Sequence, residues 1–281
     1  MPTLITQNKC AKKCGPLLAS LWLAAGCFLA PAASHAETIP SSWSFVVAAD
    51  PHLRENRKDE PAGVEKFRRV LSRIGKIDPK PDFMLLLGDI HPDKLPSLLP
   101  EIKIPIHPVH GNHETPEQRQ TLRSLFPDDF QGKDFYRFEH RGCLFIALCT
   151  AASIDHVGHL AAPTITPPAG QREWLEEQLR DAPRFQHCFI YGHIPPDAQC
   201  RANDMCLAPD DSKFLLDLVQ KAKPTALFFG HRHQQIDFSI GGIPVYGVRS
   251  CNWNVKKEPL GFLLVKVESG KTNVEFIPTP P

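Results

Sequence analysis

Short apolar runs divide the chain, and each of them stops abruptly at a polar group. A continuous apolar run of five to eight residues, bounded by polar or turn-forming residues, is typical of a strand buried on both faces. We therefore expect buried strands at the following runs: Phe45–Ala49, Phe83–Leu87, Ile102–Val109, His187–Tyr191 and Thr225–Phe229.

Between these runs the apolar positions follow a helical period. From Pro61 to Ile77 the apolar residues recur every three or four positions, with Arg and Lys between them, which predicts an amphipathic helix. Further helices are expected over Thr115–Phe126 and Gly170–Ala182, and one that resumes near Asp211. Strands that alternate with helices predict an α/β fold.

The remaining segments read as paired strands and loops. Two paired strands are expected at Phe135–Glu139 and Cys143–Cys149, and the tail from Gln234 to Pro281 predicts a run of antiparallel strands. Residues 151–169 carry three prolines and little periodicity, which indicates a long loop. We expect this loop and residues 194–210 to select the substrate. Nothing along the chain predicts its oligomeric state.

The first 36 residues resemble a secretory signal peptide. They hold three lysines and no acidic residue, followed by an apolar run from Leu17 to Ala33 and the small residues before Glu37. We expect residues 1–36 to be removed and residues 37–281 to form one exported domain, periplasmic or secreted. Two alternatives stay open, a single membrane-spanning anchor and a lipoprotein cleaved before Cys27. No later stretch is apolar enough to span a bilayer.

Charge and cysteine content narrow the function classes. Without its first 36 residues the chain holds 29 basic and 31 acidic residues, so its formal charge is −2. A chain without net positive charge lacks the electrostatic footprint of nucleic-acid binding. Of nine cysteines, six remain, and Cys200 and Cys206 are spaced to close a small disulfide loop in an oxidising compartment.

The polar groups that follow the strands are the candidate chemistry. They comprise carboxylates, an amide and imidazoles, a set that suits divalent manganese, zinc or iron. There are too many of them for one tetrahedral site, and their number suits two neighbouring ions that share a carboxylate. We expect them to meet at the edge of a single sheet. They are Asp50, His52, Asp89, Asn112, His113, His193, His231 and His233.

In this order, the segments Asp50-x-His52, Gly88-Asp89, Gly111-Asn112-His113-Glu114, Gly192-His193 and Gly230-His231-x-His233 resemble the calcineurin-like metallophosphoesterase family. The resemblance implies a four-layer α-β-β-α sandwich of two mixed sheets flanked by helices. It implies that Asp89 bridges two ions. It assigns the first ion to Asp50, His52 and His233, and the second to Asn112, His193 and His231.

The resemblance also implies an activity. Two ions about 3.5–4 Å apart generate a bridging hydroxide that attacks phosphorus in line, and His113 serves the leaving oxygen as an acid. The Val-Asp-Arg-Gly continuation of the family's protein phosphatases is absent after Gly88-Asp89, which disfavours a phosphoprotein substrate. We therefore expect a phosphoric ester hydrolase acting on a small phosphate ester. Two alternatives stay open, a phosphodiesterase for nucleotide or lipid-linked diesters and a non-catalytic metal- or ligand-binding protein of the same fold.

Overall fold

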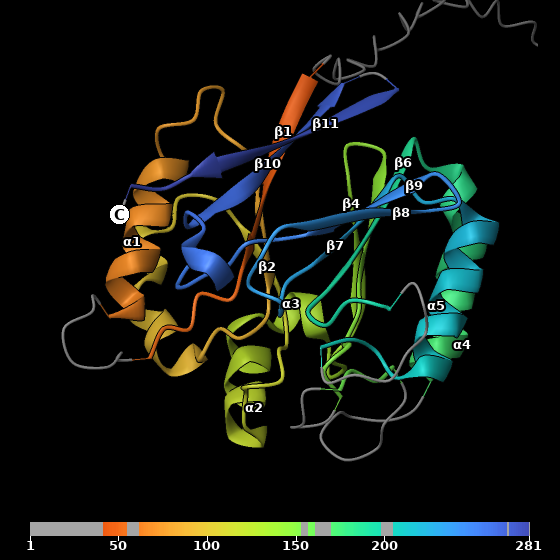
Figure 1. The fold of residues 1–281 in the computed structure, drawn as a ribbon, viewed down its shortest axis with the longest axis horizontal. Helices are drawn as coiled ribbons and strands as arrows, with labels where there is room; N and C mark the ends of the chain where they lie inside the picture. Colours follow the sequence, from red (N-terminus) through yellow and green to blue (C-terminus); the bar gives the residue numbers. More distant parts are fainter. Residues whose placement is uncertain are drawn as a thin grey trace, which may run out of the picture. The chain divides into compact units, whose positions relative to one another are not determined.

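Two mixed β-sheets form the centre of the domain (Figure 1). The computed structural model describes residues 42–54, 62–152, 157–160, 170–197, 205–268 and 270–280. The predicted signal peptide, Cys27 and the predicted Cys200 partner of Cys206 lie outside these residues. All described residues belong to one unit, Ile39–Pro281.

The first sheet has the strand order β11-β10-β1-β2-β3. Its strands β1, β2 and β3 are parallel, while β10 pairs antiparallel with β1 and with β11. Strands β1, β2, β3 and β10 are largely apolar and buried because both faces of the sheet are covered there, whereas the edge strand β11 is half polar and mostly exposed or half-buried. The bounds are β1 Ser42–Ala49, β2 Met84–Leu87, β3 Ile106–Val109, β10 Gly261–Glu268 and β11 Lys271–Pro278.

The second sheet has the order β4-β5-β6-β7-β9-β8. Its four central strands are parallel, and the edge strands β4 and β8 run antiparallel to their neighbours. The bounds are β4 Tyr136–His140, β5 Cys143–Ala147, β6 His187–Gly192, β7 Ala226–Phe229, β8 Ile236–Ile240 and β9 Ile243–Gly247.

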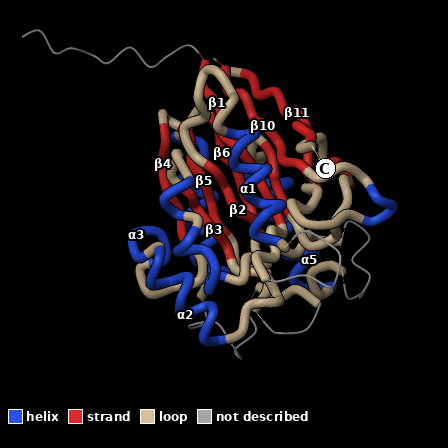
Figure 2. The backbone as a smooth tube through the Cα atoms, turned by 90° about the vertical axis from the view of Figure 1, so that its left-hand side faces the viewer, coloured by secondary structure: helices blue, strands red, loops and turns tan. Residues whose placement is uncertain are grey.

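Helices cover the outer faces of both sheets, which gives four layers (Figures 1 and 2). Helix α1 packs Phe67 and Val70 into the same apolar cluster as the first sheet, and α4 and α5 pack Leu175 and Leu215 against the second. The helices are α1 Gly63–Ile74, α2 Pro116–Leu125, α3 Pro127–Phe130, α4 Gln171–Asp181 and α5 Pro209–Ala222, with short 3-10 turns η1 Pro92–Ser97, η2 Leu99–Glu101, η3 Ala182–Arg184 and η4 Val255–Lys257. The predicted α/β sandwich of two mixed sheets is confirmed.

Aromatic rings fill the space between the two sheets. Phe45 of β1 stacks on Phe83 with ring centroids 5.3 Å apart and meets the edges of Phe145 and Phe189 of the second sheet, each at 5.3 Å. Offset and edge-to-face pairs of this kind add to the free energy of apolar burial. This core holds the two sheets together beneath their polar strand ends.

The C-terminal strands are antiparallel hairpins, as the sequence predicts, but they do not form one run. They form two antiparallel hairpins, β8–β9 and β10–β11, that join different sheets. Strand β9 also pairs in parallel with β7, and β10 pairs with β1. The pattern of apolar and turn residues locates strands but not their partners, because pairing depends on contacts distant in sequence.

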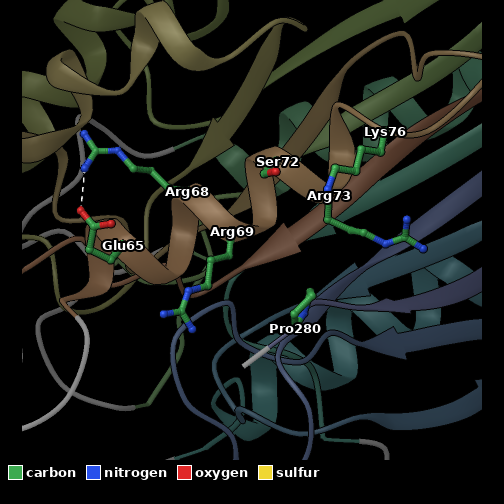
Figure 3. Close-up of a pocket in the computed structure, with 7 residues that line it drawn as sticks. All are labelled: Glu65, Arg68, Arg69, Ser72, Arg73, Lys76 and Pro280. Atoms are coloured by element: carbon green, nitrogen blue, oxygen red, sulfur yellow. Dashed lines mark hydrogen bonds and ion pairs between the residues drawn. The ribbon is translucent and has the colours of Figure 1, made fainter.

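The outward face of α1 is basic. A hollow of about 290 Å³ is lined by Glu65, Arg68, Arg69, Ser72, Arg73, Lys76 and Pro280 (Figure 3). The charge of Arg68 is balanced by Glu65 at 2.6 Å and Glu101 at 2.9 Å. None of the candidate metal-binding side chains lines this hollow.

Within the described part of the chain, no helix combines the length and apolar character that a membrane crossing requires.

Candidate metal centre

The five polar strand ends come together, but from two sheets rather than one. Strands β1, β2 and β3 of the first sheet carry Asp50, Asp89 and the segment after Gly111, whereas β6 and β7 of the second sheet lead to His193 and His231. The expectation of a single sheet edge is wrong. The groups still meet because the carboxyl ends of both sets of parallel strands lie at the same edge of the stacked sheets.

Asp89 lies at the centre of the cluster. Its Oδ2 atom is 3.3 Å from His193 Nε2 and 3.7 Å from His52 Nε2. Its Oδ1 atom accepts a hydrogen bond from the His113 backbone N–H at 3.1 Å. The carboxylate is 2% exposed, so it is nearly closed to solvent. Several groups of the cluster share it.

Asp50 is the second carboxylate of the cluster and lies beside His233. Its Oδ1 atom lies 3.2 Å from His233 Nε2 and 3.9 Å from His193 Nδ1. Both of its oxygens accept the His231 backbone N–H, at 3.2 and 3.1 Å. Asp50 therefore connects the first strand end to the last one.

The ligand atoms fall into two groups that share one carboxylate. In each group the atoms lie within 4.8 Å of one another, and the groups are Asp50, His52, Asp89 and His233, and Asp89, His193 and His231. Asn112 joins the second group, since its Oδ1 atom is 3.1 Å from His193 Nε2. The assignment of each residue to an ion stays a prediction.

The donor atoms fit divalent cations. His233 Nδ1 lies 2.8 Å from the Trp253 carbonyl, to which it donates, and His193 Nδ1 donates to the Leu87 carbonyl at 2.7 Å. When these rings are neutral, the contacts leave Nε2 of each ring as the acceptor atom, and that atom faces the cluster. His233 Nε2 lies 3.2 Å from His52 Nε2, a spacing of two nitrogens that share an ion at 2.0–2.1 Å.

His113 differs from the other candidates because its side chain is 38% exposed. Its Nε2 atom lies 3.9 Å from Asp89 Oδ2, and its ring centroid is 5.5 Å from that of His52. It therefore stands at the open side of the cluster. This position suits a group that meets the substrate.

The backbone of the strand ends is strained. Positive φ angles, which disfavour residues with a Cβ, occur at Asp50 (50°), His52 (41°), Asp89 (51°), His231 (69°) and His233 (47°). Each costs on the order of 1–2 kcal/mol, and such strain persists where the surroundings hold it for function. The left-handed turns direct side chains from the strand ends into one small volume.

Two buried residues with no role assigned from sequence hold these turns in place. The Glu114 carboxylate accepts the N–H groups of Ile90 and Gly111, both at 2.6 Å, and that of His91 at 3.1 Å. Arg119 of α2 donates to the Gly111 carbonyl at 2.7 Å. Arg119 lies three residues before Leu122, so helical spacing puts both on the buried face of α2. Its charge, not its position in the helix, is what fails to predict that it is fully buried.

The electrostatics favour charged pairs at His193 and His233, whereas burial lowers the pKa of His52 to about 4. Burial raises the pKa of Asp50 and Asp89, but the imidazoles of His233 and His193 outweigh burial and lower both pKa values. For His193, burial opposes the proton, yet Asp89 raises its pKa to about 9. Without a metal ion the site therefore holds protons where a cation would bind.

The family of this chain follows from a match to known sequences. The model of the calcineurin-like phosphoesterases matches residues 44–235, which contain every candidate ligand. The chain belongs to the calcineurin-like phosphoesterase family. The predicted class of enzyme, a metal-dependent phosphoesterase, is confirmed, and family and geometry together indicate a dimetal centre.

Relatives of this calcineurin-like phosphoesterase include named enzymes. The human serine/threonine-protein phosphatase CPPED1 is 24% identical over 269 residues, which cover 82% of this chain and 83% of that protein. A 3′,5′-cyclic-nucleotide phosphodiesterase from Nostoc sp. is 21% identical over 264 residues, which cover 86% of this chain and 94% of that protein.

Solved structures share the fold of this phosphoesterase. A dimetal phosphatase from Danio rerio matches with a TM-score of 0.63 at 14% identity, over 83% of this chain and 95% of that one. GAP50 of Plasmodium, described as the anchor in the inner membrane complex, matches with a TM-score of 0.58 at 12% identity, over 85% of both chains. At these identities the likeness extends to the fold alone.

Proposed function

We propose that this protein hydrolyses phosphate esters with two divalent ions held at the strand ends. Asp50, His52 and His233 hold the first ion, Asn112, His193 and His231 hold the second, and Asp89 bridges them. The observation that carries the proposal is the sharing of Asp89 between two groups of ligand atoms. A shared carboxylate offsets the repulsion between two neighbouring cations.

When bound, two such ions would lower the pKa of a water molecule and neutralise phosphoryl oxygens. The chain supplies the remaining parts of the reaction. The Nδ1 contacts of His193 and His233 fix their rings, and Glu114 fixes the loops that carry Asp89 and Asn112. His113, at the open side, donates a proton to the leaving oxygen.

The relatives support two substrate classes. One is named a protein phosphatase and the other a cyclic-nucleotide phosphodiesterase, so phosphoproteins join small phosphate esters and diesters as candidate substrates. The fold alone does not require catalysis, since it is shared with a protein described as an anchor. Catalysis is favoured here because each position that the proposed chemistry needs is filled.

The first test compares hydrolysis of bis-p-nitrophenyl phosphate and p-nitrophenyl phosphate by protein reloaded with manganese, zinc or iron. Asp89→Ala should abolish turnover with every ion, and His113→Ala should lower kcat while metal content, measured by mass spectrometry, stays at two ions. Asp217→Asn, an exposed carboxylate of α5, is the matched control and should change neither. Two tightly bound ions without turnover of any ester would favour the non-catalytic alternative.

We also propose that residues 1–36 direct export and are then removed. Mass spectrometry of the protein from fractionated cells should find a chain that begins at Glu37. A chain that begins at Cys27 with an added lipid, lost in Cys27→Ser, would instead establish the lipoprotein. An intact N-terminus in the membrane fraction would establish the spanning anchor.

A further inference from the structure

An exposed tryptophan lies at the edge of the metal centre. Among the described residues, Trp253 and Val255 are the large apolar side chains that are exposed, at 52% and 39%. Tryptophan is enriched at interaction sites because its indole joins a large apolar face to a polar N–H. The Trp253 ring lies 4.0 Å from the ring of His233, centroid to centroid.

The segment that carries Trp253 is fastened to the first strand end. Ser250 Oγ donates to the Asp50 carbonyl at 2.9 Å, and Asn252 Nδ2 donates to the carbonyls of Pro51 at 3.2 Å and His52 at 3.0 Å. On its far side, Asn254 Oδ1 accepts the Ser250 N–H at 2.7 Å. The indole is therefore exposed on a backbone that is held still.

The backbone after Trp253 is also strained. Lys256 and Lys257 have φ angles of 58° and 57°, an unfavourable conformation for two successive residues with a Cβ. The Val255 N–H donates to the His233 carbonyl at 2.9 Å, so the strained turn is tied to the same ligand loop. This hydrogen bond offsets part of the strain and keeps the indole beside the cluster.

Trp253 begins a row of rings that crosses the site to the proposed acid. The centroids of His233 and His52 are 5.1 Å apart, and those of His52 and His113 are 5.5 Å apart. The exposed members of this row are its two ends, Trp253 and His113. A phosphodiester whose phosphorus lies between them can place its leaving oxygen at the acid and its other ester group at the indole.

We propose that Trp253 is a specificity-determining residue on which an aromatic ring of the substrate stacks. The substrate class is then a phosphodiester whose retained ester group carries an aromatic ring, with nucleotide diesters as its natural form, because every nucleobase offers a π-face. This inference rests on the proposed phosphoesterase activity. Its position against His233 favours a role in the site over membrane docking.

The test uses adenosine 5′-monophosphate and ribose 5-phosphate as competitive inhibitors of bis-p-nitrophenyl phosphate hydrolysis. Both ligands present the same phosphate, and only the first presents a base. In the wild type and in Trp253→Phe, the nucleotide should bind about 5- to 30-fold more tightly than the sugar phosphate, which corresponds to stacking worth about 1–2 kcal/mol. In Trp253→Ala this advantage should disappear, while the inhibition constant of ribose 5-phosphate stays unchanged. An advantage that persists in Trp253→Ala overturns the proposal.

A second measurement does not depend on turnover. The nucleotide should quench the tryptophan fluorescence of the metal-loaded full chain, and ribose 5-phosphate should not. Quenching should persist in Trp174→Phe, the control that removes a tryptophan of α4, and vanish in Trp253→Phe. If no ester is hydrolysed, the proposed function fails while this quenching still decides the role of Trp253. Equal quenching in Trp253→Phe overturns the inference alone.

Discussion

Replacing Glu114 with Gln should release the loops that carry the bridging carboxylate. The substitution keeps the size of the side chain and turns one acceptor oxygen into an NH₂ donor. In either orientation of the amide, the new donor faces a backbone N–H, that of Gly111 or those of Ile90 and His91. Because Glu114 is fully buried, water cannot replace the lost bonds.

The magnitude follows from the three hydrogen bonds. The cheaper orientation leaves the Gly111 N–H unsatisfied, which costs about 1–3 kcal/mol, and the two remaining bonds lose their charge, which costs about 1 kcal/mol each. The free energy of unfolding should therefore fall by about 3–5 kcal/mol. Relaxation of the strained turn at Asp89 lowers this cost and displaces the carboxylate, so activity should fall at least 100-fold.

Urea denaturation of the metal-free protein measures the first effect, and kcat/KM for bis-p-nitrophenyl phosphate measures the second. Glu117→Gln, an exposed carboxylate at the start of α2, is the matched control and should change stability by less than about 1 kcal/mol. If Glu114→Gln unfolds within 0.5 kcal/mol of the wild type and keeps its activity, Glu114 does not hold the loops.

Three further outcomes are expected. In Gly230→Ala the new Cβ would lie 2.6 Å from Asp50 Oδ2, so activity should fall at least tenfold while the circular dichroism spectrum stays native. The control Gly75→Ala, whose Cβ meets nothing closer than 3.5 Å, should keep its activity. A fully active Gly230→Ala would show that the ligand loop can move to accept the methyl group. Burial lowers the pKa of His110. Burial of Asp134 raises the pKa of its carboxyl group, but His110 outweighs this effect and lowers it. The unfolded chain therefore binds more protons than the folded one, and the free energy of unfolding should fall from pH 7 to pH 4. Urea titrations of His110→Phe should show a flatter curve between pH 7 and pH 5; an unchanged slope would exclude His110 as its source. Chelation should abolish activity and lower the melting temperature, and manganese, zinc or iron should restore both, whereas a melting temperature insensitive to chelation would contradict a dimetal centre.

The sequence by itself determined the elements and the chemistry. Continuous apolar runs such as Met84–Leu87 identified strands covered on both faces, and the polar residue after each run identified the candidate ligands. These features are local, because a strand needs only a short apolar segment and a ligand needs only its side chain. The family followed from the same residues in the same order.

The tertiary structure alone decided how these residues meet. The sequence prediction placed the ligands on one sheet, whereas contacts distant in sequence put Asp89 and His193 on two sheets that pack together. The burial of Arg119 and the three hydrogen bonds to Glu114 also depend on loops far apart in the chain. The exposure of Trp253 beside His233 is of the same kind, since a tryptophan in a sequence predicts burial, and only the packed structure shows which face it leaves open.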